Sequence, residues 1–130
     1  MALDHIGFAV RDFPASRAFY LAALAPLGYV ATKEGENWML IGSADGHELW
    51  FGAADVAGQP PGHIHFAFAA EDHEAVRAFH TAALAAGGTD NGGPGYRPQY
   101  HTNYFAAFVI DPDGHNVEAV CHAPGKNQDQ

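Results

Sequence analysis

An internal repeat is the feature that most limits how this chain can fold. Residues 5–28, HIGFAVRDFPASRAFYLAALAPLG, align without a gap with residues 65–88, HFAFAAEDHEAVRAFHTAALAAGG, and 13 of the 24 aligned pairs are identical. Chance similarity between two alanine-rich segments is the alternative, but alanine content does not explain the matched histidine, aspartate, arginine and phenylalanine positions. The repeat therefore predicts two similar modules within 130 residues, a length typical of one domain.

Each copy of the repeat has the pattern of a strand followed by a helix. The strand-like start leads to an aspartate suited to cap a helix N-terminus, Asp12 or Asp72, and a glycine, Gly28 or Gly88, is placed to end that helix. Further strand-like segments follow each helix, at 29–32, 37–42 and 47–52 in the first half and at 104–110 and 116–121 in the second. The pattern predicts an α+β fold of two βαβββ modules, about 2–53 and 63–122, with a linker at 54–62 and a mobile tail at 123–130.

Alternation along the repeated strands separates a bulky face from a face that carries histidine and small residues. His5 shares its face with a glycine and an alanine, and His65 shares its face with two alanines. Such a face cannot fill a core, so we expect it to line a cavity for a metal ion and a small molecule. Glu118 lies in an apolar strand, where a carboxylate needs compensation that a metal ion would supply.

The repeat also separates two histidines that look equivalent in the segment HIHFAF. His65 aligns with His5, whereas His63 aligns with Leu3, outside the repeated pattern. We therefore expect His65 to bind metal and His63 to lie at the entry of the strand. The other histidines have no such match: His47 and His115 are expected to be solvated in turns, and His73, His80 and His122 are expected on the surface.

Composition excludes several classes of function. Six Lys and Arg against 15 Asp and Glu give a net charge of −9, which would repel nucleic acid and anionic lipid, so neither is an expected partner. No apolar run is long enough to span a membrane, and the start MALDHIGFAV does not read as a secretory signal, so we expect a cytoplasmic protein. The single cysteine, Cys121, cannot form an intramolecular disulfide and is expected to pack in the core.

Three segments together resemble the vicinal oxygen chelate superfamily, which includes glyoxalase I, extradiol dioxygenases and bleomycin-resistance proteins. They are LDHIGFAVRDFPASRAFY at the start, HFAFAAEDHEAVRAFH in the second copy, and FVIDPDGHNVEAV at 108–120. The resemblance implies two paired βαβββ modules with a sheet-lined cavity. It also implies a divalent metal ion (Fe, Mn, Ni or Zn) held by His5, His65 and Glu118. The usual fourth position is occupied by Trp50, and Glu48, two residues away, is a further candidate ligand.

The resemblance also indicates where the chemistry departs from named members. Extradiol enzymes and fosfomycin transferases have a tyrosine ten residues before the closing glutamate, and here that residue is Phe108. The Gly-, Pro- and Tyr-rich stretch 91–104 predicts a long loop, either idle or a pocket rim. Within it, Tyr104 and His101 are candidate catalytic residues. The expected substrate pocket consists of Trp50, Tyr96, Arg97, Tyr100 and Phe108.

Two functions from different classes fit these features. The first is a glyoxalase-like, metal-dependent enzyme that acts on a small substrate with vicinal oxygens, as a lyase, isomerase or dioxygenase. The second is a non-catalytic protein that sequesters a small molecule or drug, as bleomycin-resistance proteins do. A chain that keeps only the fold is a third. Exposed sheet edges lead us to expect a homodimer.

Overall fold

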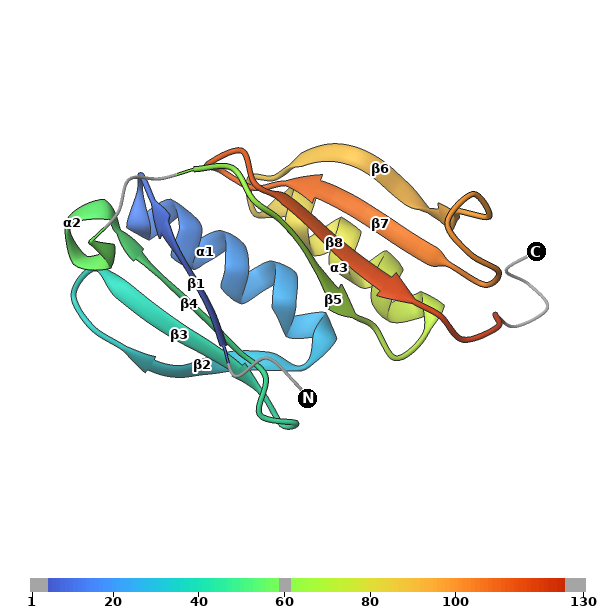
Figure 1. The fold of residues 1–130 in the computed structure, drawn as a ribbon, viewed down its shortest axis with the longest axis horizontal. Coiled ribbons are helices and arrows are strands. Elements are labelled where there is room, and N and C mark those ends of the chain that lie inside the picture. Colours follow the sequence, from blue (N-terminus) through green and yellow to red (C-terminus); the bar gives the residue numbers. More distant parts are fainter. Residues whose placement is uncertain (1–4, 59–61, 126–130) are drawn as a thin grey trace.

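The computed structural model describes residues 5–58 and 62–125, and its elements fall into two halves of the same design (Figure 1). The first half contains β1 (His5–Val10), α1 (Phe13–Leu24), the 3-10 helix η1 (Ala25–Leu27), β2 (Tyr29–Glu34), β3 (Trp38–Ser43), β4 (Glu48–Ala53) and α2 (Ala54–Ala57). The second half contains β5 (His65–Ala69), α3 (His73–Ala85), β6 (Thr89–Tyr96), β7 (Phe105–Ile110) and β8 (Asn116–Cys121). The predicted α+β class is confirmed. Parts of the predicted linker and tail, 59–61 and 126–130, lie outside the described residues.

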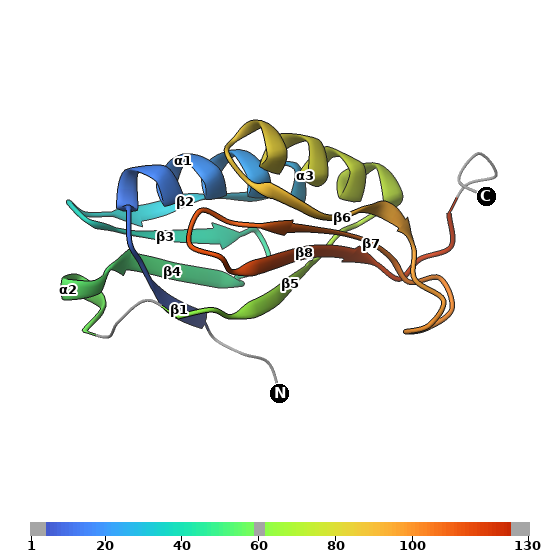
Figure 2. The ribbon, with the colours of Figure 1, turned by 90° about the horizontal axis from the view of Figure 1, so that it is seen from above.

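Each half forms its own four-stranded sheet, with strand orders β1-β4-β3-β2 and β5-β8-β7-β6. The first strand of each half pairs in parallel with the last, and the other pairs are antiparallel. Helices α1 and α3 pack against each other on the same side of both sheets (Figure 2). We call the opposite side of each sheet its open face. Over 5–58 and 62–125, no helix is long and apolar enough to cross a membrane.

The first strand of each sheet turns its bulky residues toward the helices, as the alternation predicts. Phe8 on β1 stacks against Phe51 on β4, with ring centroids 5.7 Å apart. Phe8 also lies 5.4 Å from Phe66 on β5, so the two modules share one aromatic core where their first strands approach each other. Cys121 is 1% exposed and belongs to this core, as expected.

The predicted helix starts are confirmed, whereas one of the predicted ends is wrong. The carboxylates of Asp12 and Asp72 accept hydrogen bonds from the backbone N–H groups of Ala15 (3.1 Å) and Ala75 (2.8 Å). In the first half the left-handed residue that follows the helical segment is Gly28 (φ 87°), as expected. In the second half it is Gly87 (φ 104°) rather than Gly88, because α3 stops at Ala85.

Two segments that were expected to be irregular form short regular elements. Residues 89–96 form strand β6 although the sequence TDNGGPGY has poor strand propensity. Pairing with β7 overrides that propensity, at the expense of two register shifts along the strand. In addition, the start of the predicted linker forms the single-turn helix α2.

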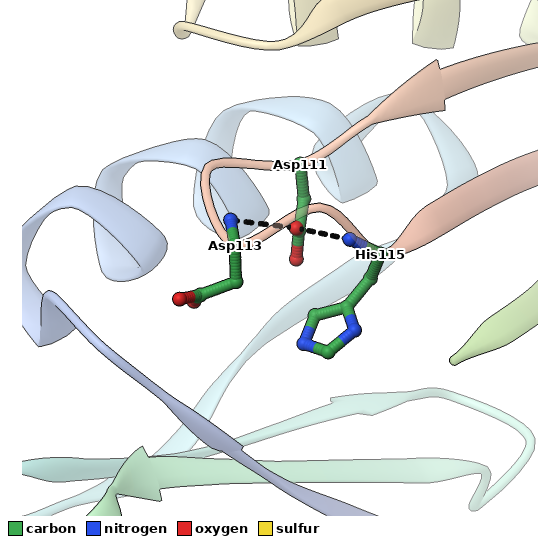
Figure 3. A group of neighbouring side chains, drawn as sticks. All are labelled: Asp111, Asp113 and His115. Carbon is green, nitrogen blue, oxygen red and sulfur yellow. Dashed lines mark hydrogen bonds between the residues drawn. The ribbon is translucent and has the colours of Figure 1, made fainter. Parts of the chain in front are cut away.

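The β7–β8 turn, residues 111–115, joins the second module to the first through hydrogen bonds of its side chains (Figure 3). Asp111 Oδ1 accepts the backbone N–H groups of Asp113 and His115, both at 2.8 Å, and its Oδ2 accepts the Tyr20 hydroxyl of α1 at 2.5 Å. Asp113 in turn accepts the backbone N–H of Arg11 (2.9 Å) and the hydroxyl of Ser16 (3.3 Å). Both aspartates are therefore used to join the turn to the first module.

Two histidines expected to be solvated are buried, and those predictions are wrong. His115 is 0% exposed, because its Nδ1 accepts the backbone N–H of Ile64 (3.0 Å) and its ring meets Phe8 edge-on at 5.0 Å. His73, 4% exposed, stacks on Phe105 at 3.8 Å. His47, the counterpart of His115 in the β3–β4 turn, is exposed, as predicted. The burial of both histidines follows from contacts with distant segments, which local patterns do not report.

The buried Tyr20 predicts a specific alkaline instability. Burial, reinforced by the charges of Asp111 and Asp113, raises the pKa of Tyr20 well above its ordinary value of 10. The protonated phenol is thus favoured in the folded state, so its stabilising effect is complete below about pH 10 and is lost as the pH rises further. Urea unfolding at a series of pH values should show the wild-type free energy of unfolding falling above about pH 10. Tyr20→Phe should be less stable at neutral pH by about 1–2 kcal/mol and should decline less at alkaline pH.

The control for this experiment is Tyr100→Phe, because Tyr100 is 61% exposed. That variant should match the wild type at every pH. An alkaline decline of the same size in Tyr20→Phe would show that Tyr20 is not its cause.

Candidate metal centre

The first module contributes one half of the candidate site, on the open face of its sheet. His5 on β1 lies directly opposite Glu48 on β4 in the parallel register. Together with Leu40 and Trp50 they line a hollow of about 500 Å³. A smaller cavity of about 160 Å³ also reaches His5 and Glu48, where the first module meets β5. An imidazole and a carboxylate therefore lie on the same face beside space for a ligand.

Trp50 occupies the position that corresponds to Glu118 in the second module. Trp50 pairs with Gly7 in the first sheet, as Glu118 pairs with Ala67 in the second. The Trp50 ring stacks on Trp38, with centroids 6.5 Å apart and an interplanar angle of 19°. This half therefore offers an aromatic wall where the other half has a carboxylate.

The second module contributes the other half through His65, Glu118 and Tyr104. Glu118 is 2% exposed, and its Oε1 lies 3.2 Å from His65 Nε2. The opposite ring nitrogen, Nδ1, lies 3.0 Å from the carbonyl oxygen of Asn116. Because a carbonyl only accepts, Nδ1 carries a proton and donates it to Asn116, so Nε2 is the ring nitrogen that faces the carboxylate and that a metal ion would bind. Such an imidazole is oriented as metal-binding histidines are.

Tyr104 completes the surroundings of Glu118. Its hydroxyl donates a hydrogen bond to Glu118 Oε2. Burial and this carboxylate raise the pKa of Tyr104 to about 12, so its phenol keeps its proton at neutral pH. The phenol thus gives the buried carboxylate a hydrogen-bond donor, which is part of the compensation that its burial requires.

The two halves do not converge on one point within a single chain. β1 and β5 run in opposite directions through the middle of the molecule (Figure 1). Since His5 begins β1 and His65 begins β5, the two histidines lie at opposite ends of this central pair. The open faces of the two sheets lie side by side rather than facing each other (Figure 2). The structure therefore brings together His5 with Glu48, and His65 with Glu118, but not all four side chains.

The one cluster of three possible metal ligands among residues 5–58 and 62–125 is Asp111, Asp113 and His115, with ligand atoms within 4.8 Å of one another. The sequence analysis did not identify it. Its carboxylate oxygens already accept hydrogen bonds from the first module, and His115 Nδ1 accepts the N–H of Ile64. This cluster therefore serves to dock the turn. Its three ligand types at alternate positions of the segment DPDGH are visible in the sequence, but its docking role is not, because the partners Ser16, Tyr20 and Ile64 lie far away in the sequence.

The predicted pocket residues divide between the two sides of the second sheet. Arg97 lies over the Phe108 ring on the open face, 5.3 Å from its centroid, and Phe108 stacks near His65 at 6.4 Å. Tyr100 is exposed and lies 5.1 Å from Tyr104. The His101 ring is exposed, 6.4 Å from Tyr104 and 5.1 Å from His122. Tyr96 instead packs against His73 and Phe105, on the helix side.

Comparisons with known proteins agree with this architecture. The family model of the Glyoxalase/Bleomycin resistance protein/Dioxygenase superfamily matches residues 2–119. The chain is similar to a glyoxalase/bleomycin resistance protein from Albidiferax ferrireducens T118, with 29% identity, a TM-score of 0.79, and coverage of 94% of this chain and 98% of that one. No curated protein matches it.

Two further solved structures share the fold at lower identity. A lactoylglutathione lyase from Agrobacterium tumefaciens has 19% identity and a TM-score of 0.69, with 92% of each chain covered. A glyoxalase-related enzyme from Fulvimarina pelagi has 18% identity and a TM-score of 0.73, with 93% of this chain and 88% of that one covered. At such identities the likeness concerns the fold alone.

Proposed function

Because the chain belongs to the glyoxalase/bleomycin resistance protein/dioxygenase superfamily, we propose that it is a glyoxalase-like, metal-dependent enzyme acting on a small molecule with two adjacent oxygens. The observation that carries this proposal is the approach of His65 Nε2 to the buried carboxylate of Glu118. A neutral imidazole oriented by a backbone carbonyl, beside a carboxylate, is a donor pair that suits a divalent ion.

In this proposal the ion is held by His5, His65 and Glu118, with Glu48 as a fourth ligand. Two imidazoles with one or two carboxylates suit Fe, Mn, Ni or Zn. When bound, such an ion would polarise the two substrate oxygens. Since one chain does not gather these four side chains, the protein would act as a homodimer. His5 and Glu48 of one copy would meet His65 and Glu118 of the other across their open faces.

The chain's own groups would handle protons beside that centre. Tyr104, with its pKa of about 12, would act as a hydrogen-bond donor and acid rather than as a base. His101 Nδ1 lies 2.8 Å from the carbonyl oxygen of Thr102, so Nδ1 carries a proton and Nε2 is the accepting nitrogen in the neutral ring. His101 would therefore be the base. Trp50, Tyr100 and Phe108 would form the walls of the substrate pocket, whereas Tyr96, on the helix side of the sheet, would not contact the substrate.

Metal content measured by mass spectrometry tests the proposal. The wild type, loaded with each candidate ion and desalted, should hold a stoichiometric metal. His5→Ala, His65→Ala and Glu118→Ala should weaken binding by more than the roughly 10–100-fold that loss of a supporting partner causes. His63→Ala is the matched control, because His63 begins the same segment outside the proposed ligand set, and it should bind like the wild type. If the wild-type protein held no stoichiometric metal after loading with any of these ions, the proposed enzymatic function would be refuted.

Replacing Tyr104 should weaken metal binding without removing a ligand. Tyr104→Phe leaves Glu118 without its phenol partner, and metal affinity should fall roughly 10-fold. Because the phenol is protonated throughout this range, the loss should be equal at about pH 6 and about pH 9. Titration of a competing chelator measures the affinities, with Tyr100→Phe as an unchanged control. Unchanged metal affinity in Tyr104→Phe would mean that the phenol does not support Glu118 as a ligand.

The stacked pair Trp38 and Trp50 favours a second candidate, sequestration of a flat cationic molecule without chemistry. The pair lies on the same open face as Glu48, in a protein with a net charge of −9. Tight binding of a cationic aromatic drug that survives chelator treatment and is lost in Trp50→Ala would favour this function. Binding that requires the metal would favour the enzyme.

A further inference from the structure

Arg97 differs from the other arginines of this acidic protein in its partners. Arg11, Arg17 and Arg77 form ion pairs with Asp113, Glu34 and Glu74, respectively. The Arg97 guanidinium donates instead to two neutral acceptors, the carbonyl oxygens of Gly95 and Gly93, both at 2.9 Å. Over residues 5–58 and 62–125, no carboxylate lies within ion-pair distance of it. Arg97 is thus a positive charge that the described part of the chain leaves uncompensated.

The glycines of β6 hold the Arg97 guanidinium in place. A Cβ atom on Gly92 would lie 3.1 Å from Arg97 Nη2, and one on Gly95 would lie 3.2 Å from Nη1. The guanidinium also rests on the ring of Phe108. Of the five N–H groups of a guanidinium, the two backbone carbonyls take only two, so the others remain for a ligand. The side chain is positioned before any ligand arrives, which reduces the entropic cost of binding.

The position of Arg97 relates it to the second half of the candidate metal centre. Phe108 lies directly opposite Glu118 in the antiparallel register and stacks near His65. Since the strand order is β5-β8-β7-β6, Phe108 lies between Arg97 and the His65–Glu118 pair on the open face. A molecule lying across Phe108 would therefore reach the guanidinium with one end and the proposed ion with the other.

We propose that Arg97 binds a carboxylate of the substrate, which is thus a small organic acid with an apolar or aromatic segment that packs beside Phe108. This inference rests on the proposed function for the chelating end of the molecule, but the contact with Arg97 needs no metal. Planar guanidinium matches carboxylate and phosphate oxygens equally well. A carboxylate is favoured because a net charge of −9 repels a dianion more strongly than a monoanion.

NMR titrations of the full-length, chelator-treated protein test this proposal. The ligands are benzoate, phenyl phosphate and the neutral analogue benzamide. Benzoate should bind more tightly than the other two and should shift signals of Phe108. Arg97→Gln should weaken benzoate binding about 10-fold or more, since a hydrogen bond to a charged group contributes that much. It should leave benzamide unchanged. Arg97→Lys should retain part of the affinity, because it keeps the charge without the planar fork.

Arg77→Gln is the matched control. Arg77 also lies over a phenylalanine ring, Phe105 at 5.1 Å, but it is ion-paired with Glu74. Benzoate should bind this variant like the wild type. Equal affinity for benzoate and benzamide, no detectable benzoate binding, or no effect of Arg97→Gln would each overturn the proposal, and tighter binding of phenyl phosphate would overturn the choice of carboxylate. Because metal is absent here, benzoate binding that depends on Arg97 would stand even if metal loading failed.

Discussion

Heterodimers of His5→Ala and His65→Ala chains should bind about half as much metal as the wild-type dimer, although each variant alone binds none. The expectation follows from the division of the proposed ligands between modules. If a site takes His5 and Glu48 from one copy and His65 and Glu118 from the other, a mixed dimer has one site with both defects and one intact site. Co-expression with two different affinity tags isolates the mixed dimers, and mass spectrometry measures their metal content.

The matched control is the mixed dimer of His65→Ala and Glu118→Ala, whose two defects lie in the same half-site. Both of its sites carry one defect, so it should hold no metal. If the His5→Ala and His65→Ala dimer also held none while wild type was loaded, each site would be built within one chain. That result would remove the shared site and leave the metal-dependent function in place.

The fold was predictable because its determinants are local. The repeat doubles a strand-to-helix signal, and Asp12 and Asp72 cap their helices through bonds to residues three positions away. Alternation in the strands decided which faces meet the helices. Strand β6 was missed because its glycines carry no strand signal and its pairing depends on β7.

The sequence predicted the residues of each half of the candidate site but not how the two halves are placed relative to each other. The repeat distinguishes His65 from His63, and an acidic residue in an apolar strand marks Glu118 as needing partners. Neither pattern contains the relative position of the two sheets, which comes from the packing of Phe8 on Phe66 and the docking of the β7–β8 turn. The burial of His115 had the same cause, since its partner Ile64 is 51 positions away. The separation of His5 from His65 is thus a property of tertiary packing.

Asp111→Ala should lower the free energy of unfolding by about 4 kcal/mol, because it leaves three buried donors without an acceptor. Each such donor costs about 1–3 kcal/mol, and water that enters the space left by the carboxylate reduces this cost. These donors are the N–H groups of Asp113 and His115 and the hydroxyl of Tyr20. The last of them joins the two modules, so its loss weakens both the turn and the docking. Urea unfolding at neutral pH measures the difference. Asp111→Asn, which keeps an acceptor oxygen, should lose less.

The first module provides the comparison that isolates docking from turn formation. Ser43 occupies the equivalent position in the β3–β4 turn, where its hydroxyl accepts the N–H of His47 at 3.3 Å in an exposed setting. Ser43→Ala should therefore cost less than about 1 kcal/mol, because water can replace the lost acceptor. Equal losses in Asp111→Ala and Ser43→Ala would mean that the second turn contributes only its local hydrogen bonds. A much larger loss at Asp111 would establish that the repeat's two turns, alike in sequence, have diverged so that one of them joins the modules.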